Sequence, residues 1–190
     1  PETSSGSRQR YKVQDRYAGP KGDLRVIHIL PRSPATEQQV RVLQRYAEIC
    51  CTLPIVDYQV RGSEILIVTS WIWGRDLGTY LRRSRRDPHC RLGSVQAFNL
   101  FRRFAHGLSH FHRRGNMVHG DLKPANLILC RDARRLIMVD FGSAWTVEKT
   151  MVRELGDGET AAYASPEQNQ GQAFVDFRSD QFSATVIAYV

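Results

Sequence analysis

The sequence lacks the features that would place the chain in a membrane or in a disulfide-rich secreted class. The apolar run at its C-terminal end, residues 184–190, is far shorter than the roughly 20 residues that span a bilayer. Residues 1–6 contain no apolar signal-peptide core. No cysteines occur at Cys-x-x-Cys spacing, and the adjacent Cys50 and Cys51 are a poor disulfide pair. We therefore expect reduced thiols, no membrane segment and a cytoplasmic location.

Acidic residues are outnumbered: 19 Asp and Glu stand against 27 Lys and Arg, which gives a net charge of +8. The excess occurs as scattered arginine pairs, such as those at 82–83, 102–103 and 134–135, without interleaved aromatic residues. This pattern predicts solvated faces and no specific nucleic-acid site, with non-specific attraction to acidic partners as the alternative. Apolar residues make up 42% of the chain, which is enough for a core.

Hydrophobic periodicity predicts both strands and helices. A helix is expected over 36–49, and Ser94 is expected to cap a longer one. Apolar residues recur at helical spacing along this second helix, which predicts a main core element: Val95, Phe98, Phe101, Phe104 or Ala105, Leu108 and Phe111. Strands are expected over residues 24–30, 55–59 and 65–69. His106 and His110 have the spacing of a metal-binding pair, but without an acidic partner we interpret them as surface or packing residues.

A loop rich in reactive side chains lies at residues 118–126, with the sequence Val-His-Gly-Asp-Leu-Lys-Pro-Ala-Asn. The proline within it disfavours a helix. Two short apolar runs follow, 127–129 and 136–139, and the polar residues 130–135 between them predict a hairpin turn. The second run ends at another acid, Asp140. The hairpin is therefore expected to carry the acid at its end back toward the loop.

Two acids, an amide and a lysine in this order suit phosphoryl transfer. Asp121 can accept the proton of an attacking hydroxyl, and Lys123 can neutralise charge on the transferred group. Asn126 and Asp140 offer the oxygen ligands that Mg²⁺ prefers. Each acid taken alone is better explained as a turn or capping residue. The complete string in order favours the chemical interpretation.

These residues resemble the signature motifs of eukaryotic-type serine/threonine protein kinases. Residues 119–126 resemble the catalytic loop, and Asp-Phe-Gly at 140–142 resembles the metal-binding motif. Residues 160–167 resemble the end of the activation loop. Residues 176–183 resemble the start of the buried central helix, where Asp180 matches an aspartate that hydrogen-bonds the catalytic-loop backbone. The resemblance is specific from about Phe98 onward and weaker before it.

The resemblance implies an α+β, two-lobed protein-kinase-like fold. The small β-rich lobe is expected over 1–70, the hinge over 71–76, and an incomplete, mostly helical large lobe over 77–190. The chain does not begin with Met and stops within what resembles the central helix, so we expect a fragment. The implied activity is Mg²⁺-dependent transfer of the ATP γ-phosphoryl group to a serine or threonine of a protein substrate.

The resemblance also assigns roles around the reacting group. Asp121 is the implied base, Lys123 and Asn126 assist it, and Thr160 with Lys123 fits the serine/threonine-specific pattern. Asn126 and Asp140 are the implied Mg²⁺ ligands.

The ATP-binding residues implied by the resemblance are less regular. Thr69 falls where the adenine pocket ends, Trp71 in the hinge, and Asp76 where the ribose binds, although interface packing explains Trp71 equally well. His28 stands where the family has its nucleotide-binding lysine, and a partly buried strand histidine is the favoured interpretation over a ligand role. Residues 11–15 resemble the strand that leaves the glycine-rich loop of the family. Lys12 on this neighbouring strand is the candidate replacement, as in the with-no-lysine kinases.

Three further departures leave alternatives open. The loop at 4–10 has one glycine where the family has three, and Gly120 replaces the arginine that binds an activation-loop phosphate. The helix at 36–49 has no glutamate at the expected position, near Leu43 or Gln44, because Glu37 and Glu48 are out of register. A pseudokinase, kept as a binding or scaffolding module, is therefore the alternative to a working kinase. A small-molecule phosphotransferase of the aminoglycoside or choline kinase type is disfavoured by Lys123 and by Ser-Pro-Glu at 165–167.

Overall fold

The computed structural model describes most of the chain. The described residues are 9–17, 23–34, 36–37, 40, 44, 51–53, 55–141, 144–146, 161–170 and 175–190. Their contacts divide the chain into two compact units. The smaller unit comprises Pro1–Glu48 and Leu53–Ile72, and the larger comprises Ile49–Thr52 and Trp73–Val190.

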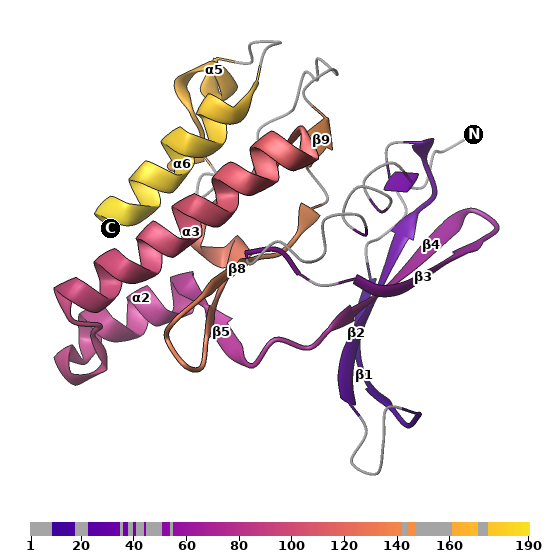
Figure 1. Ribbon diagram of the computed structural model, residues 1–190, viewed down its shortest axis with the longest axis horizontal. Coiled ribbons are helices and arrows are strands. Elements are labelled where there is room, and N and C mark those ends of the chain that lie inside the picture. The colour runs from indigo at the N-terminus through magenta and orange to yellow at the C-terminus, as the bar shows by residue number, and fades with distance from the viewer. Residues whose placement is uncertain are drawn as a thin grey trace. The chain divides into compact units, whose positions relative to one another are not determined.

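The smaller unit is built on an antiparallel sheet with strand order β1-β2-β4-β3 (Figure 1). All four predicted strands are present: β1 (Gln9–Asp15), β2 (Asp23–Pro31), β3 (Ile55–Arg61) and β4 (Glu64–Ser70). Gly62 in the short turn between β3 and β4 has a φ of +56°, which a glycine adopts without steric cost.

One face of this sheet carries the core of the smaller unit. Side chains alternate between the two faces of a strand, so Ile65 and Ile67 of β4 point the same way, and both are buried against Val40. Val40 lies in the predicted helix over 36–49, and the positions described within that range are helical. The glutamate was expected near Leu43 or Gln44; Gln44 is described, whereas Leu43 lies outside the described residues.

The larger unit is mostly helical. Its longer helices are α2 (Leu77–Arg86), α3 (Ser94–Gly115) and α6 (Phe177–Tyr189), and α6 lies alongside α3 (Figure 1). A 3-10 turn (Pro88–Cys90) precedes α3, and the short α5 (Pro166–Asn169) precedes α6. Asn116 ends α3 in a left-handed conformation with a φ of +48°.

Two predictions about α3 were wrong in detail. Gly93, and not Ser94, is the N-cap residue, and its N–H donates to the side chain of Gln96. Phe104, Leu108 and Phe111 are buried as predicted, but Val95 and Phe98 are 74% and 68% exposed. Helical spacing alone did not distinguish these two from the buried stripe.

Short strands shape the rest of the larger unit. The predicted hairpin is confirmed as β7 (Leu127–Cys130) and β8 (Leu136–Met138), and β5 (Gly74–Asp76) extends it in the order β5-β7-β8. A second pairing joins β6 (Met117–Val118) to β9 (Trp145–Thr146). The predicted catalytic loop therefore leaves one short strand, β6, and enters another, β7.

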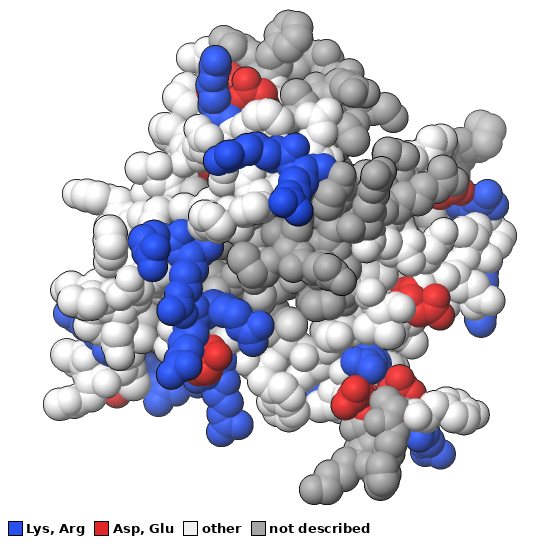
Figure 2. Space-filling view, in the orientation of Figure 1, with Lys and Arg blue, Asp and Glu red and all other residues white. Residues whose placement is uncertain are grey.

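The arginine pairs are solvent-exposed, as the sequence predicted. Several basic side chains gather in one patch on the larger unit (Figure 2). Cys51, Cys90 and Cys130 are free thiols, and burial raises the pKa of the Cys130 thiol. Within the described ranges, no helix has the length and apolar character needed to cross a bilayer.

Candidate active site

The predicted catalytic loop brings Asp121, Lys123 and Asn126 together. Asn126 is 6% exposed and lies in a 3-10 turn, Pro124–Asn126, which directly precedes β7. Its side-chain amide donates to the backbone carbonyl of Asp121 at 2.8 Å and to the Asp121 carboxylate at 3.1 Å. The Lys123 ammonium lies 3.3 Å from the same carboxylate oxygen. An amide and a cation therefore orient the Asp121 carboxylate.

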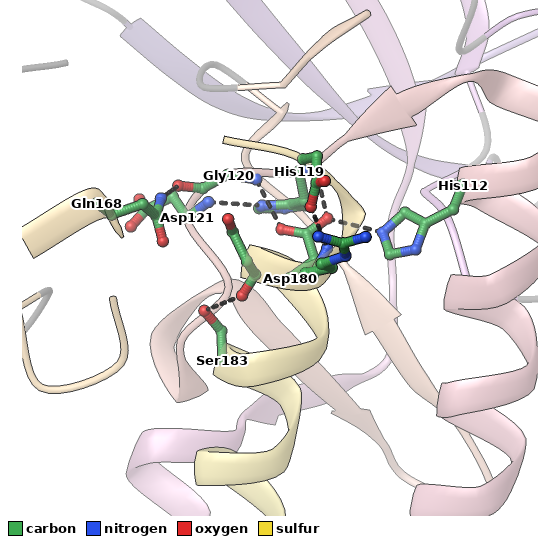
Figure 3. Close-up of polar contacts among 10 residues, drawn as sticks. His112, His119, Gly120, Asp121, Gln168, Asp180 and Ser183 are labelled. Carbon is green, nitrogen blue, oxygen red and sulfur yellow. Dashed lines mark hydrogen bonds and ion pairs between the residues drawn. The ribbon is translucent and has the colours of Figure 1, made fainter. Parts of the chain in front are cut away.

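Asp180 of α6 anchors the backbone of this loop. Its carboxylate, which is 1% exposed, accepts the backbone N–H groups of His119 at 2.7 Å and Gly120 at 2.9 Å, as predicted (Figure 3). His112 of α3 lies 2.9 Å from the same carboxylate. Three groups from two separate segments thus meet one buried acid, and these contacts offset the cost of burying its charge.

His119 and Asn126 connect this loop to the strand that carries the second acid. The ring of His119, fully buried, lies 3.1 Å through Nε2 from the backbone carbonyl of Val139, and the N–H of Val139 donates to the Asn126 carbonyl at 3.0 Å. Val139 directly precedes Asp140. The hairpin therefore returns Asp140 to the catalytic loop, as the sequence predicted.

Asp140 has a strained backbone. Its φ is +63°, a conformation that costs a non-glycine residue on the order of 1–3 kcal/mol and persists only where the surroundings enforce it. The next residue, Phe141, packs its ring against Phe111 and His119, with centroid distances of 5.8 and 5.2 Å. The packing of Phe141 thus restrains the backbone next to Asp140. Strained backbone conformations of this kind are common at functional sites.

Four of the five predicted ATP-binding residues lie in the smaller unit. Lys12 pairs with Val26 across β1 and β2, and Val26 pairs with Thr69 across β2 and β4. Directly paired residues share a face of the sheet, as do residues two apart on one strand, so Lys12, Thr69 and His28 lie on one face.

Contacts on this face join the predicted residues in pairs. The His28 ring lies 3.1 Å from the hydroxyl of Thr69, which is 3% exposed. The Lys12 ammonium lies 4.3 Å from the centroid of the Trp71 ring, within the range of a cation–π interaction. His28 therefore has the environment of a partly buried strand histidine, the interpretation favoured from the sequence.

The remaining predictions concern Asp76, Thr160, the glycine-poor loop and the histidine pair of α3. Asp76 caps α2, where its carboxylate accepts the N–H of Thr79 at 2.7 Å. Thr160 and most of the predicted glycine-poor loop lie outside the described residues. His106 and His110 stack on each other at a ring distance of 4.7 Å, and the described part of the chain contains no group of three or more His, Cys, Asp or Glu suited to a metal.

The Asn126 and Asp140 pair has the donor chemistry of a magnesium site. The Asn126 amide nitrogen faces Asp121, so its oxygen is directed away from that carboxylate. An amide oxygen and a carboxylate are hard ligands of the kind Mg²⁺ takes from proteins. These residues fit the ion in ligand type.

Comparison with known proteins decides the family. A family model described as the protein kinase domain matches residues 32–190, which is most of the chain. The chain belongs to the protein kinase family. A serine/threonine-protein kinase of Corynebacterium efficiens, drp72, is 36% identical over 124 residues, and PknA of Corynebacterium glutamicum is 35% identical over 125. Each match covers 65% of this chain but only 22% and 25% of those proteins.

Solved structures agree on the kinase fold. The kinase PK-1 of Cydia pomonella granulovirus matches 88% of this chain and 58% of its own, with a TM-score of 0.72 and 20% identity. A twitchin kinase fragment from C. elegans matches 95% of this chain and 39% of its own, with a TM-score of 0.71 and 23% identity. The expected α+β kinase fold, with a β-sheet part and a helical part, is confirmed.

Two residues of this kinase site were missed from the sequence. Gln168 donates from its side chain to the Gly120 carbonyl at 2.9 Å, and the Ser179 hydroxyl donates to the Glu167 carboxylate. Ser165 and Gln168 form a capping box at the start of α5, and the Ser-x-x-Gln spacing was a readable signal for it. No comparable signal marked Ser179.

The Ser179 contact alters the acid of the Ser-Pro-Glu motif in this kinase. Partial burial by itself would raise the pKa of Glu167. Hydrogen bonds from Ser179, from the Glu167 backbone and from Ser165 outweigh burial and lower that pKa below its ordinary value. The ionised form of Glu167 in α5 is therefore favoured by its contact with Ser179 of α6.

Proposed function

We propose that this kinase transfers the γ-phosphoryl group of ATP to serine or threonine hydroxyls of a protein substrate. The observation that carries the proposal is the orientation of the Asp121 carboxylate by Asn126 and Lys123. Its relatives are named serine/threonine-protein kinases, which supports the same reaction class. The small lobe (1–70), hinge (71–76) and large lobe (77–190) are proposed as its functional divisions.

In this proposal Asp121 accepts the proton of the attacking hydroxyl. Asn126 keeps the carboxylate aimed, because its amide bonds both the carboxylate and the backbone carbonyl of Asp121. Lys123 offsets negative charge that develops on the transferred group. Thr160 completes the serine/threonine-specific pattern with Lys123. Positioning and charge stabilisation are the main requirements of phosphoryl transfer.

Asn126 and Asp140 are the proposed ligands of Mg²⁺. These residues would hold the ion, whose positive charge would offset the negative charge of the phosphates. The strained φ of Asp140 supports this role, because backbone strain destabilises the fold and is found mainly where a function requires it.

Thr69, Trp71, Asp76 and His28 are proposed around the nucleotide, with Lys12 as the cation that replaces the missing strand lysine. Lys12 is an exposed ammonium on the same sheet face as His28 and Thr69. A cation–π contact in the range of 0.5–1 kcal/mol at an exposed site is weak enough for phosphate to displace. We also infer a cytoplasmic location, which the three free thiols support.

A second candidate, the pseudokinase, is favoured by one observation. The imidazole of His28 occupies the lysine position and contacts the hydroxyl of Thr69, so the strand offers no ammonium of its own there. In that case the fold serves as a binding module with weak or lost ATP use.

Calorimetric titration of ATP, with and without Mg²⁺, separates the two candidates. We expect Mg²⁺-dependent binding, weakened roughly tenfold by Lys12→Ala because a charge-assisted contact to phosphate contributes about 1.5 kcal/mol or more. Asp140→Asn should reduce the dependence on Mg²⁺. Arg61→Ala, which removes an exposed cation from β3 of the same sheet, is the control and should leave the Kd unchanged. Absence of binding up to millimolar ATP would support the pseudokinase.

A further inference from the structure

Both polar backbone groups of Gly120 are held by other segments. Its N–H donates to Asp180 at 2.9 Å, and its carbonyl accepts from the side chain of Gln168 at 2.9 Å (Figure 3). Gly120 has a φ of +73°, which a glycine adopts without steric cost. The residue before Asp121 is therefore fixed from two sides, by α6 and by α5.

The Gln168 amide is itself oriented. Its oxygen accepts the backbone N–H of Ser165 at 3.1 Å and the Ser165 hydroxyl at 3.2 Å. Ser165 is fully buried. Because the two donors meet the amide oxygen, the amide nitrogen must face the Gly120 carbonyl. One neutral side chain thus links the start of α5 to the catalytic loop.

This link acts on the peptide unit that leads into Asp121. A peptide unit is planar, so fixing the Gly120 carbonyl also fixes the direction of the Asp121 N–H. That N–H lies 3.4 Å from Nδ1 of the buried His119 ring. The same residue presents the carboxylate that Asn126 and Lys123 contact. A rotation of this peptide would therefore move the proposed base.

The segment that carries Gln168 is anchored in turn. The Ser183 hydroxyl of α6 donates to the Tyr163 carbonyl at 2.7 Å, and Ser179 donates to Glu167. Gln168 therefore acts from a supported element, as a residue that positions another must.

We propose that Gln168 is a positioning residue for phosphoryl transfer. Its amide orients the peptide between Gly120 and Asp121 through neutral hydrogen bonds. Gly120 offers no guanidinium for a phosphate on the activation loop. The Gln168 link supplies the connection between catalytic loop and activation segment without that phosphate. The inference rests on the proposed kinase activity and names how its base is held.

Gln168→Glu and Gln168→Ala test the link in the full chain. The glutamate has nearly the same shape, but its carboxylate repels the Gly120 carbonyl. We expect kcat to fall at least about tenfold in both variants, with KM for ATP unchanged, because a small displacement of a reacting group is costly. Phosphatase treatment of the parent should leave its kcat unchanged.

Asn169→Ala is the matched control. The Asn169 amide donates to the carbonyls of Ala164 and Ala161 in the same segment, and not to the catalytic loop. This variant should show a comparable thermal midpoint to Gln168→Ala but retain kcat. A loss of kcat in Asn169→Ala equal to that in Gln168→Glu would overturn the proposal.

Amide hydrogen exchange over residues 117–123 measures the effect of the Gln168 hydrogen bond on the catalytic loop without any substrate. Exchange there should accelerate severalfold in both Gln168 variants and remain unchanged in Asn169→Ala. If the parent transfers no phosphoryl group, the proposed function fails, and exchange alone decides the link. Equal exchange in Gln168→Glu and the parent would overturn it.

Discussion

The carboxylate of Asp180 accepts the backbone N–H of His119 at 2.7 Å, although the two residues are 61 positions apart. Both are buried, and the bond joins the central helix of the larger unit to the proposed catalytic loop. The geometry of the loop therefore depends on a residue far along the chain.

Asp180→Asn tests that dependence. The amide cannot accept from His119, Gly120 and His112 as a charged carboxylate does, so we expect a loss of about 3 kcal/mol in the free energy of unfolding. Urea denaturation followed by circular dichroism measures it. Asp176→Asn makes the same chemical change at the N-cap of the same helix, where Asn caps as well as Asp, and should cost less than about 0.5 kcal/mol. Equal losses would contradict the account.

Ser179→Ala should make stability less dependent on the charge of Glu167. Because the folded-state pKa of Glu167 is lowered, the Ser179 bond contributes fully above the ordinary value of 4.5 and is lost as pH falls through the folded pKa. We expect the variant to be about 2 kcal/mol less stable at pH 7, with the difference shrinking below pH 4.5. Urea titrations at several pH values measure this difference.

Thr185→Ala supplies the control for that pH series. Thr185 lies on the same helix and donates to the Gln181 carbonyl, so no acid is involved. Its stability difference from the parent should not change with pH. A pH-independent difference for Ser179→Ala as well would contradict the proposed link to Glu167.

Gly74→Ala tests the close approach of β5 to β7. A Cβ at Gly74 would lie 2.3 Å from the backbone oxygen of Leu129, which cannot move without breaking the strand pairing. We expect a loss of about 1–3 kcal/mol in thermal or urea denaturation. Gly115→Ala is the matched control, because its Cβ would meet only ordinary contacts and Ala favours a helix. A tolerated Gly74→Ala would show that β5 is not paired as described.

Local patterns predicted much of this fold. Three strands of the small sheet and the hairpin that returns Asp140 were predicted because alternation and short apolar runs depend on neighbouring residues only. The bond from Asp180 to the catalytic loop was predicted from the family resemblance. Periodicity located α3, but it could not show that Val95 and Phe98 face solvent, since a helix can carry two adjacent apolar stripes.

What local patterns could not predict are pairings between distant segments. The β6–β9 pairing uses two residues on each strand, too few for a pattern. Lys12 and Trp71 are 59 positions apart in the sequence. They come into contact because β1, β2 and β4 lie side by side in the sheet. Asp76 caps α2, and the sequence carries a local signal for this because Asp is a preferred N-cap residue. Its contact with the ribose stays a prediction.

Transfer of the ATP γ-phosphoryl group to serine- and threonine-containing peptides, measured for the parent and Asp121→Asn, tests the central claim most directly. Loss of the base should lower kcat by at least about 100-fold while Mg²⁺-dependent ATP binding persists. Asp132→Asn, in the exposed hairpin turn where Asn can accept the same bond from the Arg134 N–H, is the control and should retain full activity. Equal transfer by Asp121→Asn and the parent would contradict the assignment of Asp121 as the base.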